Sequence, residues 1–187
     1  LFRSIALPFA ALLGASRLIG TRGLHKGLDD LLTEALPPRY EHEIERRLHL
    51  AEAIGAKASH KTLSLFLSPE ELAEGARWFQ KKPNEKIVLL HPGSKDPFKR
   101  WPLSSFVAVA EELAKRPSHR LFVSCGPGEE HLYEPLLPFA SPLPHTSLRP
   151  FASFLAASDL LLTNDTGPFH LASALGTPAI ALYSPTD

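Results

Sequence analysis

Three short segments of the sequence combine glycine with polar or charged residues directly after an apolar run. They read HPGSKDPFKRW (residues 91–101), CGPGEE (125–130) and NDTGPFH (164–170). In an open parallel α/β sheet, ligands bind beyond the carboxyl ends of the strands, where such loops lead into helices. Because each segment follows a strand-like run, we expect the three loops to face one crevice.

The first loop has the composition of an anion-binding segment. Gly93 permits a close approach of the backbone to a ligand, and Ser94 offers a hydroxyl and an amide. Lys95, Lys99 and Arg100 place three cations within six residues. A solvated surface loop explains any one of these residues, whereas their combination at a strand end favours a ligand such as a diphosphate.

The third loop has the residue types of a helix N-terminus. Asp165 or Thr166 can cap the helix, Gly167 removes a Cβ from the path of a ligand, and Pro168 suits the first turn. Free amides and the positive end of the helix dipole then attract anions. Many helices begin this way with nothing bound, and His170 either reaches a phosphate or lies on the surface.

The second loop is less informative. Gly126 and Gly128 form a G-x-G, but position 131 is histidine, so the dinucleotide fingerprint is incomplete and an oxidoreductase domain is disfavoured. Glu130, and less securely Glu129, can accept hydrogen bonds from ribose hydroxyls. An ordinary acidic residue at a helix start is the alternative for both.

The composition excludes several classes of function. Twenty basic and twenty acidic side chains cancel, so the overall charge does not favour nucleic acid as a partner. The single cysteine, Cys125, forms no internal disulfide and is expected in the buried core. The nine histidines show no metal-ligand spacing, and no nucleophile triad or G-x-S-x-G motif is present. We therefore predict no metal site and no cofactor.

The loops are expected to lie in an α/β domain. From residue 87 onward, apolar strand-like runs at 87–90, 120–126, 159–164 and 179–184 alternate with helical patterns at 103–114, from 129, at 153–158 and at 169–176. This alternation predicts a parallel sheet with helices on both faces. Trp101 is expected to anchor the helix that follows it in the core.

The earlier residues are mainly helical. Residues 1–16 are read as an internal helix and loop, because the apolar run is too short to span a bilayer and Pro8 and Gly14 interrupt it. We expect helices over 41–55 and 68–82, the latter opening with the capping residues Ser68 and Glu71, and a short strand over 63–67. A linker at 81–86 predicts two domains, residues 1–82 and 83–187.

The segments HPGSKDPFKRWP, GPGEE and TNDTGPFHLASALGTPAIALYSPTD, in this order and spacing, closely resemble glycosyltransferase family 9, the heptosyltransferases of the lipopolysaccharide inner core. FRSIAL, RLIGTRG and HEIERRLHLAEAIGA are similar to the later part of the N-terminal domain of that family. The resemblance thus covers nearly the whole chain. It implies a GT-B architecture of two Rossmann-like domains, with residues 1–82 on the acceptor side and 83–187 binding the nucleotide-sugar.

The resemblance also assigns site residues. Ser94, Lys99, Thr166 and Gly167 would bind the donor diphosphate, Asp165 and His170 would shape the pocket for the sugar and phosphate, and Glu130 or Glu129 would hold the ribose. The implied reaction is inverting transfer of heptose from ADP-L-glycero-D-manno-heptose, without an obligatory metal. The implied acceptor is lipid A-Kdo or a core oligosaccharide.

The catalytic base expected from the resemblance is missing. In the family it is an aspartate of a glycine-aspartate loop near the start of the N-terminal domain, and this chain contains no Gly-Asp pair. We expect the chain to be a fragment that is inactive alone, from a parent protein that is a transferase. A non-catalytic nucleotide-sugar binding module and a family member with another sugar donor are the alternatives.

The resemblance implies a cytoplasmic protein that associates peripherally with the inner face of the inner membrane. Arg3, Arg22 and Lys26 can meet acidic groups of an acceptor there, or they form an ordinary solvated surface, which is the reading we favour.

Overall fold

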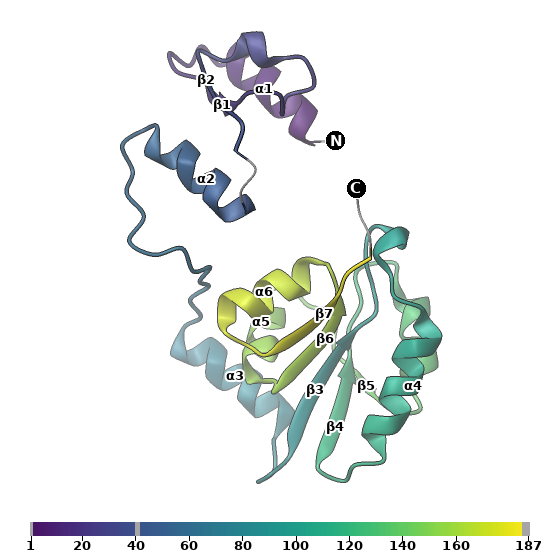
Figure 1. The fold of residues 1–187 in the computed structure, drawn as a ribbon. Helices are drawn as coiled ribbons and strands as arrows, with labels where there is room; N and C mark the ends of the chain where they lie inside the picture. Colours follow the sequence, from purple (N-terminus) through teal and green to yellow (C-terminus); the bar gives the residue numbers. More distant parts are fainter. Residues whose placement is uncertain (1, 40–41, 185–187) are drawn as a thin grey trace. The chain divides into compact units, whose positions relative to one another are not determined.

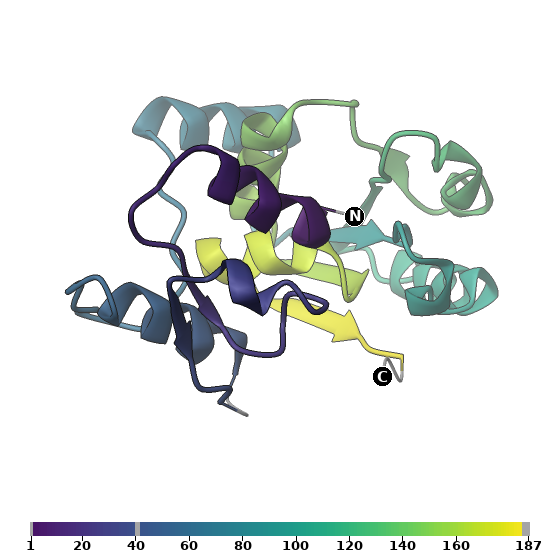
Figure 2. The ribbon, with the colours of Figure 1, turned by 90° about the horizontal axis from the view of Figure 1, so that it is seen from above.

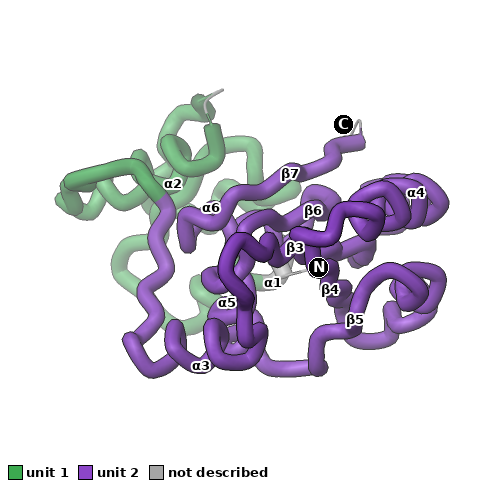
Figure 3. The backbone as a smooth tube through the Cα atoms, turned by 90° about the horizontal axis from the view of Figure 1, so that it is seen from below, with its two compact units in different colours: residues 1–62 green, residues 63–187 purple. Residues whose placement is uncertain are grey.

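The structure is a computed structural model that describes residues 2–39 and 42–184. The chain divides into two compact units, Leu1–Thr62 and Leu63–Asp187 (Figure 3). The sequence predicted a domain boundary between residues 82 and 83. The boundary between the compact units lies earlier, so that helix α3 (Pro69–Phe79) belongs to the second unit. The roles of the two parts as acceptor-side and donor-side domains stay a prediction.

Within residues 2–39 and 42–62, the first unit contains two α-helices, one 3-10 helix and a pair of short parallel strands. Its elements are α1 (Phe2–Leu12), β1 (Ile19–Thr21), the 3-10 helix η1 (Asp29–Leu31), β2 (Glu34–Leu36) and α2 (Glu43–Glu52). The expected helix at the start of the chain corresponds to α1, and that over 41–55 to α2, although residue 41 lies outside the described residues. The strand pair was not predicted, since three-residue strands leave almost no periodicity in a sequence.

None of the helices within residues 2–39 and 42–184 has the length and the apolar composition that crossing a bilayer requires.

The second unit is a parallel α/β sheet, as the sequence predicted (Figure 1). The strand order is β5-β4-β3-β6-β7, and every neighbouring pair is parallel. After α3 its elements are β3 (Lys86–His91), η2 (Pro97–Lys99), α4 (Leu103–Ala114), β4 (His119–Val123), η3 (Glu130–Leu132), η4 (Glu134–Leu136), β5 (Ser141–Pro142), α5 (Leu148–Ala157), β6 (Leu160–Asn164), α6 (Gly167–Leu175) and β7 (Ala179–Leu182).

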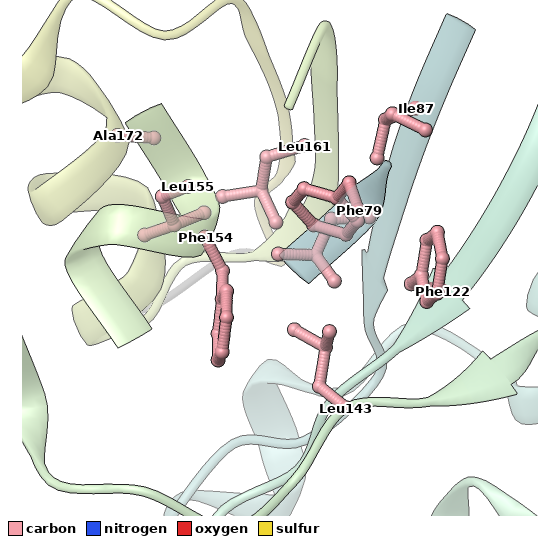
Figure 4. Packing of buried hydrophobic residues seen from close by; sticks show 9 residues of the cluster. Phe79, Ile87, Phe122, Leu143, Phe154, Leu155, Leu161 and Ala172 are labelled. Carbon is pink, nitrogen blue, oxygen red and sulfur yellow. The ribbon is translucent and has the colours of Figure 1, made fainter. Parts of the chain in front are cut away.

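Both faces of this sheet are buried, which explains the continuous apolar run of β3. Ile87 and Leu89 point to one face, where they join Phe154 of α5 and other residues of the cluster in Figure 4. Val88 and Leu90 point to the opposite face and join residues of α4, among them Phe106. Figures 1 and 2 accordingly show α4 on the opposite side of the sheet from α3, α5 and α6.

Helix α3 joins the second unit through direct contacts with α5. Ser68 and Glu71 form the predicted capping box at its start, and the Glu71 carboxylate also accepts two hydrogen bonds from Arg149 of α5, at 2.5 and 2.6 Å. At Gly75 the two helices approach so closely that a Cβ would lie 2.3 Å from the carbonyl oxygen of Ser153. Glycine is therefore needed at position 75 for space.

Three predicted elements differ from the observed ones. Residues 63–67 form no strand, and the amide of Leu65 instead donates a 3.0 Å hydrogen bond to the carbonyl of Ala174. The helix expected from residue 129 is replaced by η3 and η4, because Pro135 supplies no amide for a continuous helix. Helix α5 begins at Leu148, earlier than the predicted 153, because Pro150 lies in its first turn, where proline is tolerated.

Replacement of Gly75 by alanine should destabilise the second unit. The added Cβ meets the backbone of α5, which cannot move without displacing its buried residues, so we expect a loss of about 1 to 3 kcal/mol in the free energy of unfolding. Urea unfolding followed by tryptophan fluorescence measures this loss. Glu74→Ala, on the exposed face of the same helix, is the control and should change the midpoint little. Equal midpoints for the two variants would contradict the close helix packing.

Candidate functional site

The second unit contains a hollow of about 1360 Å³ at the carboxyl edge of its sheet. Its lining comes from Leu63, from the carboxyl end of β3, from the loops that follow β3, β4, β5 and β6, and from residues of α5 and α6. The three loops singled out in the sequence therefore share one crevice, as predicted. A volume of this size is sufficient for a ligand as large as a nucleotide-sugar.

Asn164, the last residue of β6, fixes the course of the loop that follows β3. Its side chain is fully buried, and its amide nitrogen donates to the carbonyl of Pro92 at 2.8 Å. Its side-chain oxygen accepts a 2.9 Å hydrogen bond from the amide of Trp101. The ring of Trp101 packs edge-on against Phe106, which confirms its predicted role as a core anchor. Both ends of the first loop are thus tied to the end of β6.

Glu129 ties the same loop to the segment that follows β4. One carboxylate oxygen accepts hydrogen bonds from the amide of Ser94 at 3.1 Å and from Arg100 at 2.8 Å, and the other accepts from the amide of Gly126 at 3.1 Å. Gly93 makes room for this carboxylate, because a Cβ there would lie 2.2 Å from it. The sequence had assigned Gly93 to ligand approach, whereas the structure shows it accommodating Glu129.

The start of α6 is open toward the hollow. Thr166 is the N-cap but makes no capping hydrogen bond with its side chain, and a Cβ at Gly167 would meet nothing within 4 Å. Thr166, Gly167 and His170 all line the hollow. The His170 side chain is 63% exposed, and its Nε2 lies 4.0 Å from a carboxylate oxygen of Asp165. Pro168 has no amide, and the amide of Phe169 donates to the carbonyl of Thr166 at 3.1 Å. The amide of Gly167 and the exposed imidazole of His170 are therefore the groups of the first turn that can meet an anion.

The three cations of the first loop have different partners. Lys99 donates a hydrogen bond to Asp165, and this bond raises the pKa of the lysine above its usual value. Arg100 is paired with Glu129 and also donates to the carbonyl of Ser94. Lys95 is exposed, lines the hollow, and forms no ion pair among the described residues. Ser94 lines the hollow as well, whereas Lys99 and Asp165 lie outside its lining.

His91 is a buried polar residue of the hollow to which the sequence gave no role. Its Nδ1 lies 2.9 Å from the hydroxyl of Ser124, and the residue is only 6% exposed. Burial lowers the pKa of His91 to about 4, although the nearby charge of Glu129 acts in the opposite direction. The ring is therefore neutral at pH 7. In the sequence, the sign that His91 belongs to the site was its position at the end of an otherwise apolar strand.

Cys125, Glu130 and His145 lie together beside the hollow. Their ligand atoms are all within 4.8 Å of one another, although the sequence suggested no metal-ligand spacing. Cys125 is half-buried and lines the hollow, so its predicted place in the core is wrong: β4 ends at Val123, and position 125 falls in the loop. Burial and two carboxylates raise the pKa of the Cys125 thiol to about 11.

Glu130 lies outside the lining of the hollow and accepts a 3.3 Å hydrogen bond from the amide of Gly128.

The chain is similar to known glycosyltransferases. It matches the model of glycosyltransferase family 9 (heptosyltransferase) over residues 2–187. Lipooligosaccharide heptosyltransferase 2 of Campylobacter jejuni is 28% identical over 162 residues, which cover 78% of this chain and 47% of that protein. The protein of the same name from Haemophilus influenzae is 33% identical over 136 residues, covering 66% of this chain and 39% of that protein.

Solved structures share the fold. The Escherichia coli ADP-heptose lps heptosyltransferase II superposes with a TM-score of 0.76 at 22% identity, covering 98% of this chain and 60% of that one. The E. coli heptosyltransferase WaaC with ADP-2-deoxy-2-fluoro heptose superposes with a TM-score of 0.66 at 21% identity, covering 99% and 61%. The predicted α/β fold of the GT-B type is confirmed. The chain spans about half the length of the curated relatives it matches.

The neutral, buried state of His91 should make stability depend on pH. Below about pH 6.5 the unfolded imidazole binds a proton, while the folded ring stays neutral down to about pH 4. The unfolded state then binds more protons, so stability falls as the pH drops through this window, by up to about 3 kcal/mol from this residue. Urea unfolding of the protein and of His91→Asn at several pH values measures the contribution. The free energy of unfolding of the variant should fall less steeply than that of the protein between about pH 6.5 and 4. Parallel plots of the free energy of unfolding against pH would contradict the buried neutral imidazole.

Proposed function

Because the chain belongs to glycosyltransferase family 9, we propose that its second unit binds the nucleotide-sugar donor of a heptosyltransferase. The proposed reaction transfers heptose from ADP-L-glycero-D-manno-heptose to the inner core of lipopolysaccharide, with inversion at the anomeric carbon. The observation that carries the proposal is the hollow at the carboxyl edge of the sheet, into which the open start of α6 faces beside Ser94 and Lys95. These groups suit a diphosphate.

The proposed chemistry places demands on these residues. Glycosyl transfer passes through an oxocarbenium-like state while negative charge grows on the departing diphosphate. The amide of Gly167 and the ammonium groups of Lys95 and Lys99 would stabilise that charge without an obligatory metal. To reach the diphosphate, Lys99 exchanges its bond with Asp165 for one with phosphate, and this leaves Asp165 free to bind sugar hydroxyls. We assign none of the residues of this chain to deprotonation of the acceptor.

The two glutamates of the second loop have separate proposed roles. Both carboxylate oxygens of Glu129 are already engaged with the first and second loops, so we assign it to positioning Ser94 and Arg100. Glu130 is more accessible, with 47% of its side chain exposed, and it remains the proposed partner of the ribose hydroxyls. His170 is proposed to contact the phosphate or the sugar from the first turn of α6.

The acceptor and the location of the protein follow from the family alone. We propose lipid A-Kdo or a core oligosaccharide as the acceptor, met by a cytoplasmic protein at the inner face of the inner membrane. Arg22 and Lys26 are exposed in the first unit and are able to meet acidic groups of such an acceptor. The side chain of Arg3 lies outside the described part of the chain.

Calorimetric titration with ADP, UDP and NAD tests the proposed donor class. ADP should bind in preference to UDP and NAD. Lys95→Ala and Lys99→Ala should each weaken ADP binding by about 1 to 3 kcal/mol, which is roughly 5- to 150-fold in Kd, because each variant loses a charge-assisted bond to phosphate.

Lys82→Ala is the matched control for these two variants. Lys82 precedes β3 and is therefore at the opposite end of that strand from the hollow, so its removal should leave ADP affinity unchanged. Unchanged affinity in both Lys95→Ala and Lys99→Ala would show that the diphosphate binds elsewhere. Tight binding of NAD with no measurable binding of ADP would contradict the transferase proposal. Tighter binding of UDP than of ADP would indicate a different sugar donor.

A further inference from the structure

Three side chains with different ligand atoms converge at the edge of the hollow. The Cys125 sulfur comes from the loop after β4, a carboxylate oxygen comes from Glu130 in η3, and an imidazole nitrogen of His145 comes from the loop after β5. All these atoms lie within 4.8 Å of one another, and Nε2 of His145 is 3.7 Å from a carboxylate oxygen of Glu130. The segments that follow the neighbouring strands β4 and β5 thus supply three possible metal ligands.

This set matches the preference of one kind of metal ion. Thiolate, imidazole and carboxylate together suit zinc and similar borderline cations, whereas Mg²⁺ and Ca²⁺ prefer sites made of oxygen alone. Tetrahedral ligands at zinc bond lengths lie roughly 3.3 to 3.6 Å apart. The histidine and the glutamate already stand close to this separation, so a contraction of about an ångström gathers the three atoms around one ion.

The charges around the thiol also favour a cation. The carboxylate of Glu130 lies within 4.8 Å of the Cys125 sulfur, and a negative charge at this distance attracts a cation. Cys125 and His145 line the hollow, so an ion has access to the cluster from the solvent-filled space. When the ion binds, the thiol transfers its proton to solvent and the sulfur binds the metal as thiolate.

We propose that Cys125, Glu130 and His145 bind one Zn²⁺-class cation and that this ion competes with the nucleotide. Three protein ligands leave a fourth tetrahedral position for water. The competition rests on the proposed function, because Glu130 is there the partner of the ribose and a carboxylate bound to the metal no longer accepts from ribose hydroxyls. The metal is thus an inhibitor of donor binding and takes no part in the transfer.

Cobalt binding tests the metal site without any nucleotide. Co²⁺ bound to a thiolate gives a sulfur-to-metal charge-transfer absorption, and this band reports on Cys125 because the chain has a single cysteine. Titration of the protein with Co²⁺ should give the band at one ion per chain, and Zn²⁺ should displace it. His145→Gln and Glu130→Gln should each weaken Co²⁺ affinity at least about 10-fold, since even outer-shell changes commonly cost that much.

Two neighbours provide matched controls. His131→Gln and Glu134→Gln alter exposed residues of the same residue types in the same segment, outside the cluster, and should leave the cobalt affinity unchanged. Absence of the thiolate band would overturn the site. A band of equal strength and affinity in His145→Gln and Glu130→Gln would overturn it too, because the cysteine would then be binding cobalt by itself.

Competition is measured separately by ADP titration with chelator or with saturating Zn²⁺. Zinc should weaken ADP binding at least about 10-fold in the protein and leave it unaltered in His145→Gln, while Mg²⁺ should have no such effect. Unchanged ADP affinity with zinc bound would refute the competition. Failure of ADP to bind in the presence of chelator would instead count against the proposed function, and the cobalt result would stand independently.

Discussion

The buried amide of Asn164 is the constraint on which the arrangement of the site depends. It sits at the end of β6, fully enclosed, and bonds to backbone groups at both ends of the loop after β3. A buried amide must find partners for its donors and its acceptor, and here those partners are the loop itself. The positions of Ser94, Lys99 and Arg100 follow from this attachment. Glu129 then joins the fixed loop to the segment after β4, so the walls of the hollow are cross-linked by two polar side chains.

The fold was predictable wherever burial left a periodic signal. The apolar run of β3, enclosed on both faces, and the capping residues of α3 led to the correct elements. The signal failed where proline decided the outcome, as at Pro135 and Pro150, and where strands were too short to show alternation. The boundary between the units depended on a contact between distant residues, Gly75 and Ser153. No local pattern expresses such a contact.

The sequence predicted which residues belong to the site but not which of their side chains bind one another. The sequence identified the loops, and the structure brings Ser94, Thr166, Gly167 and His170 to one hollow. It could not show that Lys99 is held by Asp165, because those residues come from different loops, 66 positions apart. Cys125 and His145 likewise come together only because β4 and β5 are neighbours in the sheet. Spacing along the chain predicts ligand sets only when one element supplies them.

The pairing of the loop cations with carboxylates has a kinetic consequence. Arg100 and Lys99 each stand against a carboxylate, and the whole chain has a formal net charge of zero. Lys95 keeps its charge without an ion pair among the described residues, so the long-range attraction of this loop for an anion comes from one cation rather than three. Discrimination among anions then lies in how long each one stays, which is set by short-range amide and ammonium contacts. Selectivity among anions accordingly resides in the dissociation rate more than in the association rate.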